Sequence, residues 1–457
     1  MTIAAIATPL GEGGIGIVRL SGNKSLAIVE KIFQPASSKK LKNNSHCLIY
    51  GTIIEPNGQA IDEALVVYMR GPHSYTAEDV VEIQAHSSIA GLQKILSLVL
   101  ANGARLANPG EFTQRAFLNG RLDLTQAEAV LDIIKSRTQA SLKLAMRQHK
   151  GLLSKKISSY RQLLKDIVVQ LEAVIDYPEE DIEDLTAQDV SAKLQALQTQ
   201  LQELLDSAKV GKVLKEGLRV VITGQPNVGK SSLLNLLLQE ERAIVSNIAG
   251  TTRDVIEEKL IVAGIPIVLV DTAGIRETED VIEKIGVAKS YSNIESADLV
   301  LLMLDASQGL NADDEKLLAA IGEQEYFVLV NKIDVPADLE KIKSQLALYK
   351  PKKTIYLSLV TGEGMAEFKE QLTQQVFGSS GQLLEDNVYI QNVRHEQLLQ
   401  TAAQHLQEAE QALQLGISLD CAVIDLRLCI DNLGCITGES VQDEIINEIF
   451  SRFCIGK

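Results

Sequence analysis

A glycine-rich loop between a strand pattern and a helix pattern constrains the middle of this chain most strongly. Residues 218–223 are mostly apolar, as in a buried strand, and Gly224-Gln225-Pro226-Asn227-Val228-Gly229-Lys230-Ser231-Ser232 follows them, with a helix expected to begin near Leu233. This is the GxxxxGK[ST] pattern in its required place. Backbone N–H groups in such a loop surround a phosphate, Lys230 neutralises its oxygens and the Ser231 hydroxyl faces Mg²⁺. The segment therefore predicts a phosphate-binding loop.

Two later segments indicate which nucleotide is bound. Asp271-Thr272-Ala273-Gly274 follows the apolar residues 265–270, and Asn331-Lys332-Ile333-Asp334 follows the apolar residues 326–330. We expect Asp271 to hold Mg²⁺ through water and the Gly274 amide to sense the γ-phosphate. The carboxylate of Asp334 would accept two hydrogen bonds from guanine that adenine does not offer, which selects GTP over ATP. Asn331 would brace the loop, Lys332 would pack along the base, and Ser358 lies where another base-contacting loop is expected.

The segment between these loops predicts a nucleotide-dependent switch. In Gly250-Thr251-Thr252-Arg253-Asp254 a threonine hydroxyl is placed to complete Mg²⁺ coordination in the GTP state. Ile275 follows Gly274, where Ras-like enzymes use a glutamine to orient the attacking water. Isoleucine cannot do this, so hydrolysis either uses another group or is very slow. Arg276, Asp280 and Glu283 are the candidates, with exposed charges on a switch helix as their alternative interpretation.

The 457 residues are too many for one hydrophobic core, and the texture of the sequence changes along the chain. Residues 1–117 predict an α+β domain, with strands at 15–20, 64–69 and 80–84 and a helix at 90–101. Residues 118–212 and 379–457 have helical periodicity, while 213–378 alternate strands and helices as in a parallel sheet. The predicted fold class is multidomain α/β plus α: a discontinuous helical domain with an inserted Ras-like P-loop domain.

Charge and cysteine content indicate which partners and which cellular compartment suit the chain. The net charge of −16 opposes nonspecific nucleic-acid binding, although a local basic patch or a basic partner would still permit RNA. Five cysteines without a CxxC pair indicate reduced thiols in a cytoplasmic protein, with all but Cys454 expected in cores. The N-terminus does not resemble a signal peptide, and no apolar run reaches the ~20 residues that cross a bilayer.

Several motifs together resemble the MnmE (TrmE) family of tRNA-modifying GTPases over nearly the whole chain. They are the 250–254 switch segment, Pro109-Gly110-Glu111-Phe112-Thr113, the segment 115–120, and the ending Phe453-Cys454-Ile455-Gly456-Lys457. The resemblance implies a homodimer formed through an N-terminal folate-binding domain, and a heterotetramer or larger complex with an FAD-dependent partner of the MnmG (GidA) type. The complex would install an aminomethyl-type group, including carboxymethylaminomethyl, on C5 of the wobble uridine of certain tRNAs. The one-carbon unit would come from a tetrahydrofolate derivative.

The resemblance also assigns roles at the nucleotide site. It implies K⁺-stimulated hydrolysis when two GTPase domains meet, with K⁺ ligands at Asn227, Ser246, Ile248 and Thr251. It implies Mg²⁺ ligands at Ser231 and Thr252 and a water-orienting carboxylate at Glu283. The predicted GTP-binding residues are Gly224, Asn227, Val228, Gly229, Lys230, Ser231, Ser232, Ser246, Asn247, Ile248, Ala249, Gly250, Thr251, Thr252, Asp271, Thr272, Ala273, Gly274, Asn331, Lys332, Asp334 and Ser358.

A second predicted site joins the two ends of the chain. Folate-contacting positions of the family match Arg19, Glu82 and Lys457, and Arg121 stands where some members have lysine. Cys454 matches a thiol with a proposed catalytic role. His86-Ser87-Ser88 stands where His-Gly-Gly is usual, which would strain a turn that needs positive φ.

Two other functions are compatible with parts of this pattern. A ribosome-assembly GTPase shares the nucleotide motifs but usually adds a basic RNA-binding module, against which the charge of −16 argues. A folate-binding enzyme with a regulatory GTPase domain is the second, and the complete nucleotide motifs argue against a vestigial domain.

Overall fold

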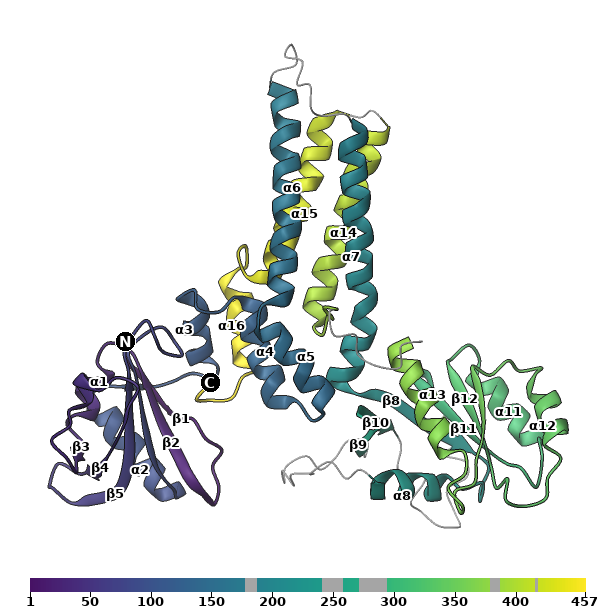
Figure 1. The fold of residues 1–457 in the computed structure, drawn as a ribbon, viewed down its shortest axis with the longest axis horizontal. Helices are drawn as coiled ribbons and strands as arrows, with labels where there is room; N and C mark the ends of the chain where they lie inside the picture. The colour runs from purple at the N-terminus through teal and green to yellow at the C-terminus, as the bar shows by residue number, and fades with distance from the viewer. Residues whose placement is uncertain (177–186, 241–257, 271–293, 379–386, 416–417) are drawn as a thin grey trace. The chain divides into compact units, whose positions relative to one another are not determined.

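The computed structural model describes residues 1–176, 187–240, 258–270, 294–378, 387–415 and 418–457 (Figure 1). By their contacts these residues form two compact units, and the boundary between the units passes through segments that the sequence assigned to the helical domain. One comprises Met1–Leu131, Gln148–Gln195 and Thr401–Lys457, and the other comprises Asp132–Arg147 and Ala196–Gln400. No helix in the described part of the chain is both long enough and apolar enough to cross a bilayer.

The N-terminal part of the first unit is a seven-stranded sheet in the order β3-β4-β5-β6-β2-β1-β7. Only the β1–β7 pair is parallel. The expected strands and helix are confirmed as parts of β2, β5, β6 and α2. The strands are β1 (Ile3–Ile6), β2 (Gly13–Ser21), β3 (Phe33–Pro35), β4 (Leu48–Ile54), β5 (Ala60–Met69), β6 (Val80–Ser87) and β7 (Arg105–Leu106), with α1 (Ser25–Val29), a 3-10 turn at Leu41–Asn43 and α2 (Ile89–Ala101).

Alternation along these strands places one face of the sheet in a core. Ile49 and Ile53 of β4 and Val66 of β5 are buried in a cluster that includes α1 and α2. Neighbouring Tyr50 and Leu65, which pair across β4 and β5, are exposed. Because successive side chains of a strand point to opposite faces, the other face of this sheet carries exposed apolar groups.

Long helices make up the rest of the first unit. The buried Arg161 side chain of α6 donates to the backbone oxygen of Ile430 in α15 and pairs with Glu439. Gly434 leaves room for it, because a Cβ there would lie 3.0 Å from the Arg161 guanidinium. The helices outside the two sheet regions are α3 (Glu111–Leu118), α4 (Leu124–Lys135), α5 (Gln139–His149), α6 (Leu152–Asp176), α7 (Ala187–Glu216), α14 (Val393–Gln414), α15 (Leu419–Thr437) and α16 (Asp443–Ser451), of which α4, α5, α7 and α14 contribute to both units.

The second unit is built around a six-stranded sheet in the order β13-β12-β11-β8-β10-β9, in which only β9 is antiparallel to its neighbour. Both faces are covered, so its central strands are apolar throughout. The alternating pattern predicted this parallel sheet, and the structure confirms it. The elements are β8 (Leu218–Gly224), α8 (Lys230–Glu240), β9 (Glu258–Val262), β10 (Ile265–Val270), β11 (Leu299–Asp305), α11 (Ala312–Ile321), β12 (Tyr326–Asn331), α12 (Leu339–Leu346), β13 (Lys353–Tyr356) and α13 (Met365–Phe377).

Candidate functional site

The predicted phosphate loop connects β8 to α8 with a backbone that needs its glycines. Gly224 and Gly229 have φ of 144° and 111°. A Cβ at Gly224 would collide with the backbone oxygen of Met303, and one at Gly229 with the Asn331 amide. Asn227 also has a positive φ, 63°, which asparagine tolerates better than most residues. The loop is therefore tightly wound, as the motif predicts.

Lys230 is the first residue of α8, and its ammonium group covers the loop. Its Nζ donates to the backbone oxygens of Gly224 at 2.6 Å and Gln225 at 2.7 Å, and burial lowers its pKa. The expectation that the helix begins near Leu233 was three residues late. Apolar spacing marks the buried face of α8, whereas the first turn, with Ser231 and Ser232, is polar because it faces the loop. The Lys230 ammonium group and the first turn of α8 thus lie together, and both attract an anion such as a phosphate.

Asn331 ties the phosphate loop to the two loops predicted to read guanine. It is 3% exposed at the end of β12. Its Nδ2 donates to the Val228 oxygen at 2.8 Å, and its Oδ1 accepts from the Leu359 amide at 3.2 Å. The predicted bracing role is what these contacts provide, because three loops are joined through one buried amide.

The remaining described base-reading residues lie at the same edge of the sheet. Asp334 is exposed, so its carboxylate is accessible to a base. Ser358 is fully buried, and its hydroxyl accepts from the amides of Val360 and Thr361 at 3.3 and 3.2 Å. The Ser358 side chain therefore shapes its own loop, and the neighbouring Leu359 amide is the group that reaches Asn331.

Asp305 is a site residue that the sequence analysis missed. Its carboxylate, 3% exposed, accepts from Lys332 Nζ at 2.6 Å and from Ser307 Oγ at 2.6 Å. Burial alone would raise the pKa of Asp305, but the hydrogen bonds from Lys332 and Ser307 outweigh it and hold the pKa below its usual range. A charged residue ending the apolar strand β11 was the available signal, because ligands of parallel sheets bind beyond the carboxyl ends of the strands.

Part of the predicted nucleotide site lies outside the described residues. This applies to the switch positions Ser246, Asn247, Ile248, Ala249, Gly250, Thr251 and Thr252, to Asp271, Thr272, Ala273 and Gly274, and to the hydrolysis candidates Ile275, Arg276, Asp280 and Glu283. Of the predicted metal ligands, only Asn227 and Ser231 are described. Roles at the other positions remain predictions.

In the first unit, the chain's ends meet at the predicted folate positions. Arg19 Nε donates to Glu82 at 2.8 Å, and Arg19 Nη1 donates to the Gly456 backbone oxygen at 3.2 Å. The Phe112 amide donates to the Lys457 oxygen at 3.2 Å. Burial and nearby Arg19 lower the pKa of Lys457, only partly opposed by Glu82 and Cys454. Residues more than 400 positions apart thus form one polar cluster.

Aromatic rings complete this cluster and were missed from the sequence. The Arg19 guanidinium lies 5.6 Å from the Tyr75 ring centre and 5.7 Å from that of Phe112. The Arg121 guanidinium lies 5.1 Å from the centre of the same Tyr75 ring, and Arg121 Nη1 donates to the backbone oxygen of Tyr75 at 2.9 Å. Arg121 therefore belongs to the cluster, and both guanidinium groups contact the Tyr75 ring.

The motif around Pro109 packs against the C-terminal residues 450–457, which are called the tail below. Glu111 is buried and accepts from Arg105, from Arg115 and from the Asn108 amide. The Gly110 amide donates to the Cys454 oxygen at 3.4 Å, and a Cβ at Gly110 would collide with the Phe450 oxygen. The motif thus forms the seat of the C-terminal residues.

Two expectations about individual residues were wrong. Ser87 ends β6 and Ser88 has φ −93°, so neither serine needs positive φ; Ser88 caps α2 by accepting from the Gly91 amide. Of the cysteines expected in cores only Cys429 is buried, and burial raises its pKa to about 12. Cys435 is half-buried. Cys47, in the turn before β4, and Cys421, near the start of α15, are exposed like Cys454.

Comparison with known proteins agrees with this architecture. The family model "MnmE helical domain" matches residues 124–454, and "GTP-binding protein TrmE N-terminus" matches residues 2–121. Two relatives, each called "tRNA modification GTPase MnmE", come from Enterococcus faecalis (47% identical) and Lactiplantibacillus plantarum (46% identical); each alignment covers 100% of this chain and 98% of the relative.

A solved structure of a single-residue variant of Aquifex aeolicus Era bound to GDP·AlF₄⁻ is 28% identical and covers 41% of this chain and 66% of its own, with a TM-score of 0.28. That similarity is too low to carry an argument. The two family models, in contrast, meet at the junction between the N-terminal sheet and the helices, and the relatives align from end to end. The chain therefore belongs to the MnmE (TrmE) family.

Proposed function

We propose that this chain is a K⁺-stimulated GTP hydrolase that acts in modification of the tRNA wobble uridine. The observation that carries the nucleotide part is Asn331, whose buried amide holds the phosphate loop and the guanine loops in one arrangement. The name of the chain's relatives, tRNA modification GTPase, supports the proposed role in tRNA modification.

The described residues supply phosphate binding and base selection. Lys230 and the first turn of α8 attract the phosphates, and GTP oxygens would replace the two loop carbonyls that Lys230 now contacts. Asp334 accepts from guanine, while Asp305 positions Lys332 beside the base. These contacts orient GTP but do not activate water, which is the role proposed for Glu283.

The predicted cations would stabilise charge on the phosphates. The hydroxyl of Ser231, at the start of α8, is a suitable oxygen ligand for Mg²⁺, with Thr252 and Asp271 as its proposed partners. The exposed amide of Asn227 offers an oxygen for K⁺, with Ser246, Ile248 and Thr251 proposed beside it. Bound cations offset negative charge that develops during hydrolysis, so an arginine finger is not required.

The first experiment is GTP hydrolysis in K⁺ and in Na⁺ at equal ionic strength. We expect faster turnover in K⁺, and we expect Asn227→Ala to lose that difference while still binding GDP. Asn57→Ala, in the β4–β5 turn of the first unit, is the matched control. Equal rates in both salts would remove the potassium mechanism but leave GTP hydrolysis itself intact.

We further propose that the cluster around Arg19 binds a tetrahydrofolate derivative. Arg19, Arg121 and Lys457 provide positive charge for its carboxylates, and Tyr75 and Phe112 provide aromatic surface for its ring. Cys454, exposed beside this cluster, is the proposed reactive thiol. Titration with 5-formyltetrahydrofolate tests this: Arg19→Gln should weaken binding at least tenfold, and the exposed Lys42→Gln should not.

The remaining partners are proposed on separate grounds. The exposed apolar face of β4 and β5, with Leu48, Tyr50 and Leu65, supports a homodimer. Sedimentation of Tyr50→Lys at several concentrations would test it, since a charged side chain there should shift the protein toward monomer. Partnership with an FAD-dependent MnmG-type protein, and a cytoplasmic location, follow from the family alone.

A further inference from the structure

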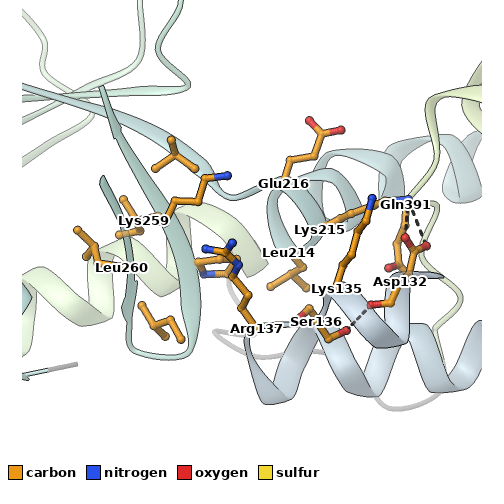
Figure 2. Close-up of a pocket in the computed structure, with 15 residues that line it drawn as sticks. Asp132, Lys135, Ser136, Arg137, Leu214, Lys215, Glu216, Lys259, Leu260 and Gln391 are labelled. Atoms are coloured by element: carbon orange, nitrogen blue, oxygen red, sulfur yellow. Dashed lines mark hydrogen bonds and ion pairs between the residues drawn. The ribbon is translucent and has the colours of Figure 1, made fainter. Parts of the chain in front are cut away.

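A cavity in the second unit is not explained by the proposed function. It has a volume of about 220 Å³ and lies where the α4–α5 junction, the end of α7 and the β9–β10 pair come together (Figure 2). Its apolar walls include Leu214, Leu260 and Val268. The phosphate loop and the guanine loops contribute no residue to it, so it is distinct from the described part of the nucleotide site.

The cavity is positively charged in a strongly acidic protein. Its lining has four basic residues and two acidic ones, whereas the chain has 44 basic and 60 acidic residues. Lys215 pairs with Asp132 at 2.9 Å, a contact drawn in Figure 2. Lys135, Arg137 and Lys259 have no ion-pair partner among the described residues, which leaves Glu216 as the one acidic lining residue not already paired there.

A buried polar side chain also lines the cavity. Gln391 is 6% exposed, and its side-chain amide makes no hydrogen bond to another described residue. This amide is therefore available to a ligand in the cavity.

We propose that this cavity binds a small anion with an apolar body, such as an aryl phosphate or an aryl carboxylate. Arg137, Lys259 and Lys135 would hold the anionic group, Gln391 would hydrogen-bond to the ligand, and the leucine and valine walls would cover its apolar part. The volume is below the ~300–1,000 Å³ of sites for drug-sized molecules, so the ligand is smaller than a nucleotide.

The cavity adjoins the two strands that flank the predicted switch segments. β9 begins at Glu258, directly after residues 241–257, and β10 ends at Val270, directly before residues 271–293. Both segments carry the predicted nucleotide switches. A ligand in the cavity therefore contacts the strand pair that leads to both of them.

The test is calorimetric titration with phenyl phosphate while the nucleotide site is saturated with Mg²⁺ and GDP. We expect saturable binding that Arg137→Gln and Lys259→Gln each weaken about tenfold, since each removes a charge-assisted hydrogen bond. Gln391→Leu keeps the side-chain volume and should weaken binding severalfold. Lys212→Gln removes an exposed charge of α7 outside the cavity and should have no effect. Thermal unfolding of each variant verifies that it is folded.

Two further ligands separate the contributions of charge and apolar surface. Inorganic phosphate should bind more weakly than phenyl phosphate because it leaves the apolar walls uncovered, and neutral benzyl alcohol should bind more weakly because it lacks charge. The proposal is overturned if phenyl phosphate shows no saturable binding, if Lys212→Gln weakens it as much as Arg137→Gln, or if inorganic phosphate binds equally well.

Discussion

Replacing Gly456 by alanine should release the C-terminal residues from their seat on the N-terminal domain. Gly456 is buried with φ +94°, and a Cβ there would lie 2.5 Å from the Ile6 oxygen and 2.8 Å from the Ala7 Cα. Both are backbone atoms, which cannot move aside as a flexible side chain can. The tail must therefore shift rather than its neighbours.

The expected magnitude follows from the contacts that a shifted tail loses. A left-handed conformation costs a non-glycine residue roughly 1–2 kcal/mol. The Arg19 bond to the Gly456 oxygen is charge-assisted and contributes about 1.5–3 kcal/mol, and the bond from the Phe112 amide to the Lys457 oxygen contributes about 0.5–1.5 kcal/mol. Together these terms reach about 3 kcal/mol even at their lower limits, which corresponds to a hundredfold or greater increase in the undocked population.

Hydrogen exchange of the Phe112 amide measures this local opening directly. We expect its protection to fall at least a hundredfold in Gly456→Ala, with a gain in removal of Lys457 by carboxypeptidase. Gly58→Ala is the matched control: Gly58 has φ +85°, but nothing lies within 4 Å of a Cβ there. It should incur the conformational cost at its own turn and leave Phe112 protected. Unchanged Phe112 protection in Gly456→Ala would refute the reasoning.

Three further predictions concern single side chains. Asn331→Ala should weaken GDP binding by about 1–3 kcal/mol, because two bonds that join the loops are lost; fluorescent-GDP titration measures it, and unaltered affinity would disprove the bracing role. Asp305→Asn should raise KM for GTP severalfold with little change in kcat, because the amide no longer attracts Lys332; a fall in kcat alone would contradict a positioning role. Burial alone would raise the pKa of Glu111, but bonds from Arg105, the Asn108 amide and Arg115 lower it to about 2. Its ionised form therefore contributes roughly 3 kcal/mol of stability above pH 4.5, and this is lost as the pH falls toward 2. Glu111→Gln should accordingly be less stable at pH 7, and denaturant titrations should show the difference shrinking at pH 3.

The nucleotide motifs could be predicted because their chemistry is local. The phosphate loop is one contiguous segment, and its glycines, lysine and serine need only the strand before it and the helix after it. The base-reading loop at Asn331 could be added because parallel strands bring their carboxyl ends to one edge. The exact start of α8 could not be predicted, because the spacing of apolar residues marks the buried face of a helix and not its polar first turn.

Other features depend on partners that the sequence does not place together. Asp305 and Lys332 are 27 positions apart and meet because β11 and β12 are neighbours in register. Tyr75 lies in the connection between β5 and β6, and only the fold brings this connection to Arg19 of β2 and to Arg121. The exposure of Cys47 and Cys421 also depends on the packing around the turn before β4 and around the start of α15, which composition does not report.

By itself, then, the sequence determined the strand and helix alternation of the second unit, the phosphate and guanine loops, and membership of a family. These follow from short-range spacing and from one rule of parallel sheets. Only the tertiary structure decided how the tail is seated, since the hydrogen bond from Arg19 to Gly456 spans 437 positions. It also decided which basic side chains line the cavity at Gln391. Such contacts join distant segments, and their geometry is set by the packing of whole helices and sheets rather than by any local pattern of residues.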